Sequence, residues 1–257
     1  MRTRITKYQR ISRPCCLFAL TLVLALSLLV GCTQDLPLGS ILSQDHAVDA
    51  PASGAATSSA FDLASIPPND GKGYVELNGG KPTFTDADKA LPYGYESYAP
   101  LDSLGRCGAA MALVGVETIP EPGSKRQNIS KIHPSGWEQA RYDFIPGEAL
   151  YNRSHLIARE LTAEEANPNN LITGTQYMNQ SNMRPFEDAV RNFIDLTGYH
   201  VLFRATPIFQ GDELVARGVQ LEAWSLEDEG DGICLNVYCY NEQPGVTIDY
   251  ATGASWL

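Results

Sequence analysis

The stretch Arg141-Tyr-Asp-Phe-Ile-Pro-Gly-Glu-Ala-Leu-Tyr-Asn-Arg-Ser-His155 contains two extended runs on either side of a turn pair. Residues 141–145 alternate between polar and apolar side chains, which is the period of a strand with one buried face. Pro146-Gly147 is a turn signal, and residues 149–155 form the second run. The stretch therefore predicts a β-hairpin whose second arm ends at His155.

The segments after the hairpin predict a loop, a helix and more strands. Residues 167–170 are rich in Asn and Pro and indicate a loop. Residues 185–196 carry apolar side chains at helical spacing between a proline start and a stop at Gly198, so they predict the best helix of the chain. Three later runs are typical of strands, namely residues 199–206, 214–224 and 233–240. The expected fold class is α+β, an antiparallel β-sheet core with hairpin, loop and helix laid against it.

The N-terminal part of the chain has the features of an export signal. Residues 1–31 hold five basic residues and no acid, and their apolar run has the length of a signal-peptide core. The run ends in Leu29-Val30-Gly31-Cys32, which resembles the lipobox of bacterial lipoproteins. An ordinary signal peptide, with Cys32 an incidental thiol, is the alternative. We expect a lipoprotein signal peptide at 1–31, lipidation at Cys32, a flexible tether at 32–60 and a folded body at 61–257.

The charge balance limits how the protein can meet a nucleic acid. Among its 257 residues, 19 Lys and Arg stand against 30 Asp and Glu, which gives a formal net charge of -11. A uniformly basic protein that holds phosphates by bulk attraction is thereby excluded. If nucleic acid is the partner, the protein must recognise it through local contacts and not through its overall charge.

Cysteine content limits the cross-links in the body. Only Cys107, Cys234 and Cys239 lie beyond the expected tether, so at most one disulfide can form there. Cys234 and Cys239 share an expected strand at a spacing that points them to opposite faces, which disfavours their pairing. No Cys-x-x-Cys pair occurs in the body, which argues against a structural zinc site.

His155, Asn179 and Glu187 are residue types that phosphodiester hydrolysis can use. A neutral imidazole can deprotonate water near neutral pH, so His155 is the candidate general base. A neutral amide such as that of Asn179 can hold a hard cation such as Mg²⁺ and leave its charge available to the phosphate. Glu187, at the helix start, could then hold water around the cation. The alternatives are a packed histidine, a turn-forming asparagine and a glutamate favoured by the helix dipole.

Three arginines are candidate phosphate contacts. Arg153 and His155 are two residues apart, so strand alternation puts them on one face. Arg191 lies one helical turn beyond Glu187, where it could reach a phosphate oxygen or form only an i,i+4 surface pair. Arg106 could contact substrate or stabilise a turn.

The run Asn152-Arg-Ser-His155 resembles the Asp-Arg-Gly-His signature of the DNA/RNA non-specific endonuclease family, whose active site is a ββα-metal motif. It is closer still to the secreted streptococcal DNases. The resemblance extends from about residue 61 to residue 253 and therefore covers essentially the whole body, but neither the leader nor the tether. Similar blocks occur at residues 101–108, 170–179, 185–187 and 243–253.

The resemblance implies a role for each candidate. His155 would be the general base, Asn179 the direct metal ligand and Glu187 a helper that orients metal-bound water. Arg153 would contact the phosphate or the transition state, and Arg191 matches the family less closely. The chain departs from the family pattern at Asn152, where the family has Asp, and at Ser154, where it has Gly. Neither departure removes a group that the chemistry requires.

The sequence thus predicts a membrane-tethered endonuclease on the extracellular face of a bacterial membrane, with residues 61–257 as a ββα-metal nuclease domain. Its partner would be DNA, with RNA as a second substrate, and its cofactor one divalent cation, Mg²⁺ or Mn²⁺. Contact with the membrane would be through the lipid anchor only. Two alternatives remain: a surface lipoprotein that binds nucleic acid without cutting it, and a metal-dependent phosphodiesterase acting on another substrate.

Overall fold

The computed structural model of the protein describes residues 63–257. The expected signal peptide at 1–31, the lipidation site Cys32 and the tether at 32–60 lie outside the described residues. Among the residues that the structure describes, no helix combines the length and the apolar character needed to cross a bilayer.

A six-stranded antiparallel sheet forms the core of the body, with the strand order β1-β8-β7-β6-β3-β2. Strands β6, β7 and β8 of this sheet correspond to the three strands that the sequence predicts. Their apolar side chains are buried because helical segments pack against the sheet. The expected α+β class is confirmed. The strands are β1 (Tyr74–Glu76), β2 (Glu96–Tyr98), β3 (Ala110–Val114), β6 (Val201–Ile208), β7 (Gly218–Ser225) and β8 (Cys234–Tyr240).

A separate two-stranded ribbon is formed by β4 (Tyr151–His155) and β5 (Leu171–Thr175). The two strands are antiparallel, and His155 pairs with Leu171 across the ribbon. All of β5 is buried, so β4 pairs along its length with a strand of the interior. The strand at 171–175 was not among those expected from the sequence.

The predicted hairpin within residues 141–155 is wrong in its pairing. Only one bridge, Arg141 to Ala149, joins its two arms. Between them the chain folds back in tight turns, in which Ile145 donates to Tyr142 O and Glu148 donates to Ile145 O. Those turns use the backbone groups that a strand would pair, and β4 pairs with β5 instead.

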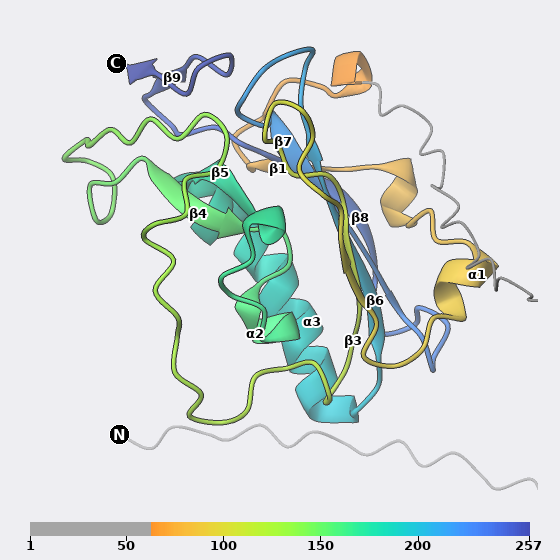
Figure 1. The fold of residues 1–257 in the computed structure, drawn as a ribbon. Helices are drawn as coiled ribbons and strands as arrows, with labels where there is room; N and C mark the ends of the chain where they lie inside the picture. Colours follow the sequence, from red (N-terminus) through yellow and green to blue (C-terminus); the bar gives the residue numbers. More distant parts are fainter. Residues whose placement is uncertain (1–62) are drawn as a thin grey trace, which may run out of the picture. The chain divides into compact units, whose positions relative to one another are not determined.

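The main helix, α3 (Arg184–Thr197), covers one face of the large sheet and has the β4–β5 ribbon on its other side (Figure 1). It confirms the helix predicted at 185–196. Val190 and Ile194 are buried in the core shared with the sheet, and each contributes about 1.5–3 kcal/mol through its burial. Gly198 ends the helix in the left-handed conformation, with φ 70°.

A π-helical segment, η4 (Met178–Met183), runs directly into α3. It contains Asn179, although the Asn-rich sequence around this residue is typical of a loop. The short elements elsewhere are η1 (Leu63–Ser65), η2 (Asn78–Gly80), α1 (Asp86–Lys89), α2 (Arg159–Thr162), η3 (Pro168–Asn170), β9 (Thr247–Ile248) and β10 (Ser255–Trp256). The order β4, β5, η4 and α3 therefore brings a strand end, a π turn and a helix start to one place.

The cysteines of the body are all free thiols, which agrees with the expectation that Cys234 and Cys239 do not pair. Both lie on β8, where Cys234 is exposed and Cys239 is buried.

Candidate active site

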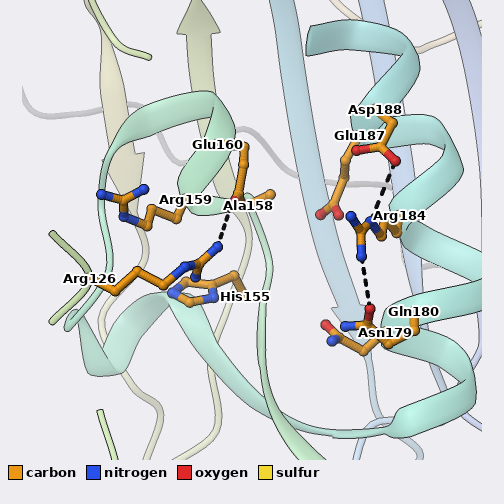
Figure 2. Close-up of a pocket in the computed structure, with 10 residues that line it drawn as sticks. All are labelled: Arg126, His155, Ala158, Arg159, Glu160, Asn179, Gln180, Arg184, Glu187 and Asp188. Carbon is orange, nitrogen blue, oxygen red and sulfur yellow. Dashed lines mark hydrogen bonds and ion pairs between the residues drawn. The ribbon is translucent and has the colours of Figure 1, made fainter. Parts of the chain in front are cut away.

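A pocket of about 200 Å³ opens between the end of β4, helix α2 and the start of α3. Figure 2 shows two walls, one with His155 and one with Asn179 and Glu187. The structure therefore brings together the three groups that the sequence proposed for catalysis and metal binding. The lining residues are Arg126, His155, Ala158, Arg159, Glu160, Asn179, Gln180, Arg184, Glu187 and Asp188.

His155 is the last residue of β4, and a backbone carbonyl holds its ring. Its Nε2 lies 3.0 Å from the carbonyl oxygen of Glu165. A carbonyl only accepts, so Nε2 carries the proton and Nδ1 of the neutral ring is left with a lone pair. Burial lowers the pKa of His155 below its ordinary value, although the bond to Glu165 and the nearby carboxylates act in the opposite direction. The ring is therefore neutral, and able to accept a proton, near neutral pH.

The loop that anchors His155 is fixed by the buried carboxylate of Glu165. The backbone N–H of Gln127 donates to this carboxylate at 2.6 Å, and Arg159 Nε donates at 3.1 Å. Arg126 lies 3.5 Å away from its other oxygen. Because the side chain and the carbonyl belong to the same residue, these bonds also fix the carbonyl that holds His155.

Asn179 is held by the residue next to His155. The hydroxyl of Ser154 donates to Asn179 Oδ1 at 2.7 Å. Ser154 is fully buried in β4, whereas Asn179 lines the pocket. The amide oxygen is therefore oriented by the strand that also carries the imidazole.

Glu187 lies on the first turn of α3 and is half-buried. Burial raises the pKa of its carboxyl to about 8, and the carboxylates of Glu160 and Asp188 add to the rise. Arg184 acts in the opposite direction. A carboxyl that is protonated for lack of positive charge becomes ionised when a cation is nearby, so this side of the pocket suits a cation.

The pocket also holds arginines that the sequence analysis missed. Arg126 forms an ion pair with Glu160, and Arg184 lies 3.4 Å from Asp188. Arg126 comes from a loop far from the strand and the helix in sequence, and no periodicity marked it. Arg184 lies immediately before the expected helix start, near Glu187. Its position close to a candidate site residue is the sequence feature that could have identified it.

Arg153 does not line the pocket. Its guanidinium donates to the carbonyl oxygens of Ile132 (2.5 Å) and Ser130 (2.6 Å), and it stacks over the ring of Trp137 at 4.2 Å. In this structure it fastens the loop around residue 130 to β4. A phosphate contact would require it to leave those partners.

Arg191 and Arg106 are also outside the pocket. Arg191 binds both carboxylate oxygens of Asp195 at 3.0 Å and donates to Glu160 O, instead of pairing with Glu187. Arg106 pairs with Asp102 at 2.8 Å and donates to two carbonyls, those of Gly211 and Glu213. The contacts of Arg106 are those of a structural arginine at a turn.

The donor set of the pocket fits a hydrated divalent cation. Within residues 63–257 no group of three or more His, Cys, Asp or Glu side chains could hold a metal ion. A cation here would rely on the amide oxygen of Asn179, with water in the other positions and carboxylates beyond. Mg²⁺ commonly keeps several waters and takes only one or two protein oxygens.

A family model for DNA/RNA non-specific endonucleases matches residues 87–226, more than half of the chain. The matched region contains β4, η4 and α3, and with them His155, Asn179 and Glu187. The chain belongs to the DNA/RNA non-specific endonuclease family. It is therefore a nuclease, a hydrolase of phosphodiester bonds in nucleic acid.

Solved nucleases share the fold. NucA from Streptococcus agalactiae with magnesium ion bound is 29% identical, over 72% of this chain and 87% of NucA, with a TM-score of 0.62. NucA with no metal bound is 28% identical over 80% of this chain and all of NucA, with a TM-score of 0.63. The Sda1 nuclease with bound zinc ion is 29% identical over 63% of this chain and 80% of Sda1, with a TM-score of 0.56. No curated protein matches the chain.

Proposed function

We propose that the chain is an extracellular endonuclease that cleaves DNA, and RNA as well, with His155 as the general base and one divalent cation, Mg²⁺ or Mn²⁺, on Asn179. The observation that carries the proposal is that His155 and Asn179 line opposite walls of one pocket. The imidazole can deprotonate the attacking water and the amide oxygen can bind a cation, which are two functions that hydrolysis of a phosphodiester uses.

In this proposal His155 takes the proton of the attacking water on Nδ1. The carbonyl of Glu165 keeps the other ring nitrogen protonated, so only Nδ1 can accept. The imidazolium that forms gains from the carboxylates of Glu160 and Glu165, both of which favour its charged form. The base is thus oriented before substrate arrives.

Asn179 would hold the cation through Oδ1, and Glu187 would orient the water that hydrates it. The cation, when bound, offsets the charge that gathers on the phosphate and the leaving 3′ oxygen. The magnesium in NucA supports Mg²⁺, whereas Sda1 holds zinc, so the fold accommodates more than one divalent ion.

Arginines of the pocket supply the remaining positive charge for the substrate. Arg126 and Arg184 lie on opposite walls and are both more than half exposed. Arg126 is paired with the carboxylates of Glu160 and Glu165, and Arg184 is paired with that of Asp188, so a phosphate must compete with these carboxylates to bind. To contact a phosphate, Arg153, Arg191 and Arg106 would each have to leave the backbone carbonyls to which they donate.

The location of the enzyme is a further part of the proposal. The basic leader and the Gly31-Cys32 junction support export and lipid attachment at Cys32. Residues 32–60 would then link residues 61–257 to the extracellular face of a bacterial membrane.

A plasmid-nicking assay with the purified chain tests the proposal. With Mg²⁺ we expect nicking of DNA and cleavage of RNA, both abolished by EDTA. His155→Ala should lower the rate by about 10² to 10⁴, the usual contribution of a general base, and free imidazole should restore part of it. His133→Ala is the matched control, because His133 is exposed and does not line the pocket.

Two results would redirect the proposal. Binding of plasmid with no nicking would favour the alternative of a lipoprotein that captures nucleic acid. Faster turnover of bis-p-nitrophenyl phosphate than of DNA would favour another phosphodiester as the substrate.

A further inference from the structure

Ser154 has a buried hydroxyl that donates a hydrogen bond to Asn179, the proposed metal ligand. Its side chain is fully buried in β4, between the half-buried residues Arg153 and His155. Its hydroxyl donates to Oδ1 of Asn179 at 2.7 Å. Because Asn179 Oδ1 is the oxygen proposed to bind the cation, a buried hydroxyl that donates to it requires an explanation beyond packing.

The opposite strand leaves room for this side chain. A Cβ added to Gly174 of β5 would lie 2.6 Å from Ser154 Cβ and 3.0 Å from its Oγ. It would also lie 2.8 Å from Met178 Cε, next to Asn179 in the π turn. The glycine thus creates the slot in which the serine hydroxyl reaches the amide.

We propose that Ser154 is a positioning residue for the cation, acting through Asn179, and this inference rests on the function proposed above. An amide side chain rotates about its terminal bond and can present either oxygen or nitrogen. A hydroxyl that donates to Oδ1 fixes the amide oxygen on the side of β4. The second lone pair of this amide oxygen is then left for the ion. Groups that hold metal ligands in this way are commonly worth about 10-fold to 100-fold in metal affinity.

The imidazole has its own anchor, which separates the two roles. His155 is held by the carbonyl of Glu165, whereas the Ser154 hydroxyl donates to Asn179 and not to the imidazole ring. Loss of the Ser154 hydroxyl should therefore weaken cation binding and leave the protonation of the base unchanged. A general loss of packing around β4 would disturb both.

The test measures Mn²⁺ binding by electron paramagnetic resonance on the full chain without nucleic acid, together with the Mg²⁺ dependence of nicking. We expect Ser154→Ala to weaken Mn²⁺ binding about tenfold. At saturating Mg²⁺ the rate should stay within about twofold of wild type, with an unchanged acid limb in the pH profile. Ser225→Ala is the matched control, since Ser225 is an equally buried serine at the end of β7, outside the pocket, where its hydroxyl bonds to Asp228 and to the Ile233 backbone. This control should keep wild-type Mn²⁺ affinity.

A double-mutant cycle keeps the inference falsifiable if stability falls. Because Ser154 acts through the amide, Ser154→Ala should cause no further loss of Mn²⁺ binding in an Asn179→Ala background. Normal Mn²⁺ affinity in Ser154→Ala, or additive losses in the double variant, would overturn the inference even if Asn179→Ala alone weakens binding. If Asn179→Ala binds Mn²⁺ normally, the proposed metal site itself fails, and the role of Ser154 fails with it.

Discussion

At the scale of single residues, the imidazole of His155 must satisfy two conditions at once. It must be neutral in order to take a proton, and it must present the correct nitrogen to the water. Burial meets the first condition by disfavouring the charged ring, and the Glu165 carbonyl meets the second by fixing the tautomer. The two effects come from different parts of the site, so they can be measured separately.

The pH dependence of kcat/KM reports the first condition. The neutral ring is the active form, so activity is lost as pH falls through the pKa of His155. Because burial holds that pKa below its ordinary value, we expect the acid limb to have its midpoint below about 6.5. A nearby divalent cation would repel the imidazolium and move the limb in the same direction.

The measurement is an initial-rate profile at fixed, saturating Mg²⁺, with His155→Ala carried alongside. An acid limb well above neutrality would contradict the assignment. So would the same limb in the residual activity of His155→Ala.

Single residues also show how far sequence reasoning reaches. His155, Asn179 and Glu187 could be proposed as one site because resemblance supplied their grouping and their residue types supplied the chemistry. The arginines could not be assigned in this way. Whether a guanidinium can contact substrate depends on whether loops distant in sequence already bind it. Arg153, for example, donates to the backbone carbonyls of residues 130 and 132. Arg126 lines the pocket from the same region.

At the scale of elements, helix α3 has both a structural and a functional role. One face packs Val190 and Ile194 into the core, and its first turn presents Glu187 to the pocket. The sequence predicted this helix because apolar spacing, a proline start and a glycine stop are all local signals. The pairing of β4 with β5 was missed because alternation identifies a strand without identifying its partner.

The two faces of α3 should differ sharply in their contribution to stability. Ile194 is 1% exposed, whereas Leu196 on the same helix is 85% exposed. Ile194→Ala should lower the free energy of unfolding by about 2–5 kcal/mol through lost burial and a residual cavity. Leu196→Ala should change it by no more than about 0.5 kcal/mol.

Urea denaturation of both variants, followed by circular dichroism, provides the comparison. Equal destabilisation by the two substitutions would mean that α3 does not dock on the sheet as described. Wild-type stability in Ile194→Ala would lead to the same conclusion.

At the scale of the whole molecule, an acidic protein must bind an acidic polymer. The formal net charge of -11 repels nucleic acid at distances up to a Debye length, about 10 Å at 0.1 M salt. Attraction must come from the cation and the few arginines of the pocket, each of which already has a carboxylate or carbonyl partner. Binding to phosphates therefore releases few counterions.

The salt dependence of DNA binding follows from this count of contacts. If the pocket arginines Arg126, Arg159 and Arg184 provide the phosphate contacts, log affinity against log salt should have a slope no steeper than about -3. The measurement is the affinity of His155→Ala for duplex DNA from about 50 to 200 mM NaCl at one Mg²⁺ concentration, because this variant should cut too slowly to degrade the DNA during the measurement. A slope near -6 would require about twice as many phosphate contacts as the pocket provides. In that case Arg153, Arg191 or a surface beyond the pocket would have to engage the polymer, and the view that recognition is local would be wrong.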